Sequence, residues 1–74
     1  MPRLDGLSDR ELEVLQLVSG HLTNLQIADR LTISELTVES HVHHILHKLH
    51  VNSRRSAARI YLEWIAHSRG NGNS

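Results

Sequence analysis

Hydrophobic residues recur along this chain every three or four positions, the spacing that places them on one face of a helix. One such set falls on a compact arc at helical spacing and comprises Val38, Val42, Ile45, Leu46 and Leu49. Apolar and polar residues nowhere alternate in the two-residue rhythm of a strand. The pattern predicts an all-α fold of four helices, over about residues 9–19, 24–31, 35–49 and 54–68.

Each predicted helix follows a residue that can cap a helix start: Ser8, Thr23, Ser34 and, as a weaker signal, Ser53. Glu11 and Gln26 lie three residues after the first two caps, which is the capping-box spacing. At the end of the first helix we expect Gly20 to take the left-handed conformation that terminates many helices.

The chain has 74 residues, which is enough for one domain, 1–74, and no second. We expect order over about residues 5–68 and a flexible tail over 69–74, where glycine and asparagine dominate. The absence of cysteine excludes disulfides and thiolate metal sites. No apolar run is long enough to span a membrane, and the first residues lack a signal-peptide layout. These features predict a soluble, cytoplasmic protein.

The formal net charge of zero conceals an uneven distribution. Residues 1–39 hold seven acids against three arginines, whereas residues 40–74 hold five basic residues against one acid. Five of the seven histidines also fall between His41 and His50. The second half of the chain is therefore basic, as a surface that meets nucleic acid usually is.

Only Thr32, Ile33 and Ser34 separate the second and third predicted helices, so these helices must meet at a steep angle. This arrangement is the helix-turn-helix plan, although a helical hairpin in a small bundle would give the same pattern. Opposite its apolar arc the third helix is expected to present a fully polar face: Glu39, Ser40, His43, His47 and His50, with His44 at the edge. Such a face suits a DNA major groove, and it also suits plain solvent exposure.

A series of residues at fixed spacing favours the first interpretation. The segments are Leu7-Ser8-x-Arg10-Glu11-x-x-Val14-Leu15, then Gly20-x-x-Thr23-Asn24-x-x-Ile27-Ala28-x-x-Leu31, then Ser34-x-x-Thr37-Val38-x-x-His41-Val42-x-x-Ile45-x-x-Lys48-Leu49-x-Val51-x-Ser53-Arg54. Over about residues 5–67 the chain resembles the LuxR-type (FixJ/NarL-type) DNA-binding domain. The resemblance implies a helix-turn-helix domain that binds double-stranded DNA at the C-terminus of a bacterial transcription regulator, behind a receiver or signal-binding domain.

The resemblance also implies which residues meet DNA. Glu39, Ser40 and His43 occupy the positions that reach into the major groove, where family members often carry lysine or arginine at the first and third. Glu39 can accept a hydrogen bond from cytosine or can pair with His43 one turn later. The full set of expected DNA contacts is Thr23, Asn24, Ser34, Thr37, Val38, Glu39, Ser40, Val42, His43, His47 and Lys48.

Several of these residues have a structural alternative. The Thr23 and Ser34 hydroxyls can cap their helices, bind phosphate, or do both. Lys48 can contact a phosphate or form a salt bridge with Glu11. The histidines are spaced three and four apart, so they could share a metal, but no closed ligand set is apparent and no metal or cofactor is expected. Their protonation would instead make DNA affinity depend on pH.

The fourth helix has two apolar stripes. Ala57, Ile60, Tyr61 and Trp64 can close the core, while Ala58, Leu62 and Ile65 leave an apolar strip. Burial between neighbouring helices or packing on another domain would explain the strip. The resemblance implies instead a homodimer interface, for which we expect Ala58, Tyr61, Leu62 and Ile65. Arg54, Arg55 and Arg59 could contact the DNA backbone or form a solvated cationic turn.

The sequence contains no nucleophile–base pair with an orienting acid and no glycine-rich phosphate loop, so no enzyme activity is expected. The alternative to DNA binding is a protein-interaction module of the same fold, whose DNA affinity is weakened by Glu39 and the acidic first half.

Overall fold

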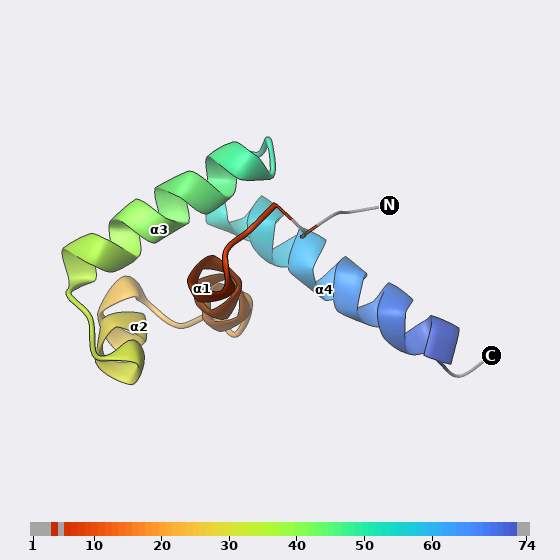
Figure 1. Ribbon diagram of the computed structural model, residues 1–74, viewed down its shortest axis with the longest axis horizontal. Helices are drawn as coiled ribbons and strands as arrows, with labels where there is room; N and C mark the ends of the chain where they lie inside the picture. Colours follow the sequence, from red (N-terminus) through yellow and green to blue (C-terminus); the bar gives the residue numbers. More distant parts are fainter. Residues whose placement is uncertain (1–3, 5, 73–74) are drawn as a thin grey trace.

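The computed structural model describes residues 4 and 6–72, with side chains as far as Ser68 (Figure 1). Its described residues form four helices and no strand: α1 (Asp9–Ser19), α2 (Asn24–Leu31), α3 (Glu35–Lys48) and α4 (Arg54–Gly72). Helix α1 contacts the other three helices, α2 packs against α3, and α4 crosses α1 and extends away from the other helices. The all-α prediction is confirmed.

The helix starts are where the capping residues predict them. The Ser8 hydroxyl accepts a hydrogen bond from the Glu11 backbone N–H at 3.1 Å, and the Glu11 carboxylate accepts one from the Ser8 N–H at 2.9 Å. Thr23 and Gln26 form the same reciprocal pair at the start of α2. Ser34 caps α3, and the Ser53 hydroxyl accepts from the Ser56 N–H at the start of α4.

The helix ends differ from the prediction. Gly20 is not left-handed (φ −87°); the next residue, His21, is (φ 67°). The amides of His21 and Leu22 bond back to Val18 and Leu17, so a Schellman motif ends α1. Equivalent motifs place Thr32 and His50 at positive φ after α2 and α3. In each motif an apolar residue follows the left-handed one and contacts the core: Leu22, Ile33 and Val51.

Two boundaries also shift. Helix α3 ends at Lys48, one residue early, because Leu49 is already its C-cap. Helix α4 continues to Gly72, four residues beyond the predicted end at 68. The first four residues of the predicted flexible tail therefore belong to this helix, residues 73–74 lie outside the described residues, and the flexibility of the tail stays a prediction.

The core lies where the three long helices meet. Its fully buried side chains come from all four helices: Val14 and Leu15 from α1, Ile27 from α2, Val38 and Ile45 from α3, and Ala57 from α4. Partly buried leucines and isoleucines surround this core. Every helix is thereby anchored by its apolar face, which leaves the opposite face of α3 free.

Candidate nucleic-acid interface

Helices α2 and α3 form a compact helix-turn-helix unit. The Ile33 N–H bonds to the Ala28 carbonyl at 3.0 Å, so the last turn of α2 fixes the path of the connection. Ser34 then caps α3 directly, leaving three residues between the helices. Because Ile27 and Val38 are both completely buried, the two helices share one core and cannot pivot independently.

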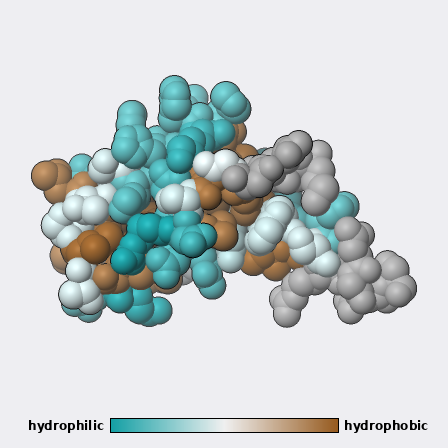
Figure 2. All heavy atoms as spheres, in the orientation of Figure 1, coloured by the Kyte–Doolittle hydropathy of each residue, from teal (hydrophilic) through white to brown (hydrophobic). Residues whose placement is uncertain are grey.

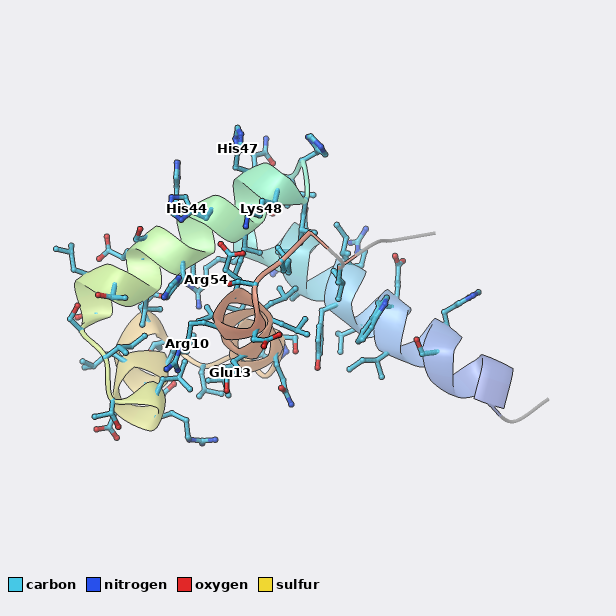
Figure 3. The ribbon with its side chains drawn as sticks, in the orientation of Figure 1. Arg10, Glu13, His44, His47, Lys48 and Arg54 are labelled. Atoms are coloured by element: carbon cyan, nitrogen blue, oxygen red, sulfur yellow. The ribbon has the colours of Figure 1, made fainter. Side chains whose placement is uncertain are left out.

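The outer face of α3, opposite the core, is exposed. It consists of Leu36, Glu39, Ser40, His43, His44 and His47. Figure 2 shows hydrophilic atoms along the edge of the molecule that α3 forms, and Figure 3 shows His44 and His47 projecting away from the other helices. Sequence reasoning missed Leu36, which is 74% exposed. The outer face is therefore not fully polar, contrary to the prediction.

Two of the residues expected to contact DNA have buried side chains. Val38 is completely buried and Val42 is only 9% exposed, so both side chains fill the core and cannot reach a nucleic acid. Their positions in the motif serve to anchor α3. The exposed residues beside them are the ones available to a ligand.

The polar residues at the helix starts are already engaged in capping. The Thr23 and Ser34 oxygens accept backbone N–H groups, and the Ser34 and Thr37 hydroxyls lie 2.7 Å apart. All three side chains are exposed, and a hydroxyl that accepts one bond can still donate another. Capping and phosphate binding are thus compatible at these positions.

Asn24 has a different partner. Its side-chain oxygen accepts a hydrogen bond from the Arg54 guanidinium, which also donates to the Leu22 carbonyl at 3.0 Å. Arg54 is half-buried and joins the start of α4 to the start of α2 (Figure 3). The sequence suggested that Arg54 contacts the DNA backbone or lies in a solvated cationic turn, and neither alternative includes these two internal hydrogen bonds. No local sequence signal could have revealed a bond between residues 30 positions apart.

Lys48 forms the salt bridge with Glu11 that was predicted as the alternative to a phosphate contact. Its ammonium lies 2.7 Å from the Glu11 carboxylate, whose side chain is only 7% exposed. Burial raises the pKa of Glu11, but hydrogen bonds from Lys48 and from the Ser8 backbone, with the Lys48 charge, outweigh it and leave the pKa lowered. Lys48 therefore stabilises a nearly buried carboxylate and joins α3 to α1.

Three histidines of α3, His43, His44 and His47, have exposed side chains, whereas His41 is half-buried. The rings of His43 and His44 are 6.1 Å apart and tilted, and both are exposed. Within the part of the chain that the structure describes, no group of three or more histidine or acidic side chains is placed to hold a metal ion. The geometry therefore gives the shared-metal alternative no support.

The family model described as "Bacterial regulatory proteins, luxR family" matches residues 5–61. The chain belongs to the LuxR family of bacterial regulatory proteins. This family is a class of transcription regulators and not of enzymes.

The relatives of this LuxR-family chain are longer proteins. The nitrate/nitrite response regulator protein homolog of Haemophilus influenzae is 47% identical over 60 residues, which are 81% of this chain and 29% of that protein. The DNA-binding transcriptional activator DevR/DosR of Mycobacterium tuberculosis is 41% identical over 70 residues, 95% of this chain and 32% of that protein. The crystal structure of the response regulator ChrA, of a heme-sensing two-component system, superposes with a TM-score of 0.75 at 42% identity and covers 86% of this chain and 31% of that one.

In this LuxR-family domain, the strip of α4 that was predicted to form a dimer interface exposes less apolar surface than its four residues suggest. Tyr61 is only 7% exposed and belongs to the core, so little of it could meet a second copy. Ala58 and Ile65 are half-buried, and Leu62 is 52% exposed. The family match ends at residue 61, just before Leu62 and Ile65.

In the described part of the chain no helix combines the length and apolarity that crossing a bilayer requires.

Proposed function

We propose that this chain is the output domain of a bacterial transcription regulator and binds double-stranded DNA sequence-specifically, with α3 in the major groove. The observation that carries the proposal is the outer face of α3, which is exposed along its length while the opposite face is fixed in the core. A helix held in this way can enter the groove without rearranging the fold.

The outer face offers donors and acceptors at base-reading positions. Glu39 can accept from cytosine N4, Ser40 can donate or accept, and His43 can donate to guanine. All three side chains are exposed. Phosphate contacts would come from Thr23, Ser34 and Thr37, which surround the N-termini of α2 and α3 where free backbone N–H groups favour anions. His47 lies near the other end of the same face.

Two further proposals concern assembly. The chain spans about 30% of the length of the relatives compared above, so we propose that a receiver or signal-binding domain precedes it in the full regulator. We also propose a cytoplasmic homodimer that contacts its copy through half-buried Ala58, exposed Leu62 and half-buried Ile65, the part of the predicted α4 strip that the core does not bury. No catalytic role is proposed for any residue.

The direct test replaces base-reading side chains. A duplex is selected from a random-sequence library with the wild-type chain, and its affinity is measured by fluorescence anisotropy for Ser40→Ala and His43→Ala. Each variant should lose about 5- to 100-fold in affinity for the selected duplex, with a smaller loss on unrelated DNA. His67→Ala, an exposed histidine on α4, is the matched control and should bind like the wild type.

One observation favours the rival function, a protein-interaction module. An acid, Glu39, is exposed on the outer face, and the domain has no formal net charge. Both features weaken attraction to phosphate. If no duplex is enriched in the selection and none binds even at low salt, the interaction module is the better account.

A further inference from the structure

The side chain of Leu36 is the most exposed large hydrophobic group among the described residues, at 74%. It stands at the second position of α3, after Glu35, and the structure gives it no place in the core. Its neighbours on the outer face are polar. Leu36 is therefore the one apolar side chain that the outer face of α3 would present to a bound partner.

Helical geometry puts Leu36 in the middle of the outer face. At about 100° per residue, Ser40 lies about 40° and His47 about 20° around the helix from Leu36. The buried residues Val38 and Ile45 lie on the opposite side. Leu36 also borders a shallow depression that is lined by Ser34, Thr37, Ser40, His41 and His44. Figure 2 shows hydrophobic atoms at the end of the molecule where α3 begins, beside the hydrophilic atoms of the outer face.

The chemistry of the major groove limits what Leu36 can contact there. The base edges present donors and acceptors, and the one apolar group among them is the C5 methyl of thymine. A leucine has no polar atom with which to read any other base. We infer that Leu36 is a specificity-determining residue that packs against a thymine methyl, so that the recognised half-site contains an A·T pair at that place. This inference rests on the proposed function.

Leu25 provides the contrast that isolates this effect. It is also an exposed leucine, at 64%, and it is also the second residue of its helix. It borders a different depression, formed with Ala28 and Ile33 among others, and does not lie on α3. Replacing Leu25 therefore removes an exposed leucine without changing the outer face of α3.

The test removes single methyl groups from the DNA. A duplex selected with the wild-type chain is resynthesised with each thymine replaced in turn by deoxyuridine, which differs only in lacking the C5 methyl. Wild type should lose about fourfold in affinity when the deoxyuridine stands at one position in each half-site, because one buried methyl group is lost there. Leu36→Ala should bind the thymine duplex and the deoxyuridine duplex with the same affinity. Leu25→Ala should keep the wild-type ratio of the two affinities. Circular dichroism checks that the variants keep their helices.

Two results would overturn the inference. One is wild-type binding that is insensitive to deoxyuridine at every position, which would indicate that Leu36 meets something other than DNA. The other is a deoxyuridine penalty that persists in Leu36→Ala. Either result leaves the proposed DNA binding intact, whereas failure to select any duplex would remove the proposed function and this inference together.

Discussion

At the scale of single residues, the ion pair between Lys48 and Glu11 links α3 to α1. The carboxylate is almost buried, but the lysine side chain is 43% exposed. The two partners are therefore not equivalent. Losing the lysine leaves a buried charge with only the Ser8 N–H as a partner, while losing the carboxylate leaves a lysine that water can solvate.

We therefore expect Lys48→Met to reduce the free energy of unfolding at pH 7 by about 1–2 kcal/mol. Glu11→Gln, which keeps an oxygen for the Ser8 N–H, should cost less. Urea denaturation measures both. Because the folded-state pKa of Glu11 is lowered, its contribution is present above the unfolded pKa and is lost as the pH falls through the folded value. Equal costs for the two variants, or a loss that appears toward high pH, would contradict this account.

The helix ends give a second prediction at this scale. Thr32 is β-branched and left-handed, a conformation that costs a non-glycine residue about 1–2 kcal/mol. Thr32→Gly should raise the free energy of unfolding by about 0.5–1 kcal/mol after the greater entropy loss of glycine is subtracted.

Gly20→Ala is the matched comparison for Thr32→Gly. Gly20 has negative φ, and an added Cβ would meet its nearest neighbours, including the Leu22 side chain, no closer than 3.5 Å. This substitution should be stabilising by about 0.4–1 kcal/mol through the unfolded chain. Thermal melts of Thr32→Gly and Gly20→Ala measure both changes in stability. A large destabilisation by Gly20→Ala would mean that the left-handed residue is Gly20 after all.

At the scale of helices, the starts were predictable and the ends were not. Ser8, Thr23 and Ser34 act on amides three residues away, so the chain itself carries their signal. The left-handed residues His21 and His50 depend on how the following apolar side chain meets the core, which the local sequence does not show.

The candidate site was predictable to a similar degree. The periodicity of α3 separated its buried face from its exposed face, because burial repeats with the helical turn. The periodicity did not reveal the hydrogen bond from Arg54 to Asn24, since a bond between distant segments leaves no local pattern. The family motif also gave no means of distinguishing buried Val38 and Val42 from residues that touch a ligand.

At the scale of the whole molecule, two of the eight basic residues are engaged in contacts between helices or helix starts. Lys48 is bound to Glu11, and Arg54 to Asn24 and Leu22. The remaining contacts would come largely from helix N-termini, hydroxyls and histidines. We therefore expect a binder whose electrostatic contribution per copy is modest and whose operator affinity depends on a second copy.

The most direct test of DNA binding is a salt series. The affinity of the 74-residue chain for duplex DNA is measured from low to physiological salt, and its logarithm is plotted against the logarithm of salt concentration. DNA binding through the α2–α3 unit predicts a straight line with a negative slope, corresponding to only a few neutralised phosphates per copy. No measurable binding to any duplex at low salt would contradict the proposed function.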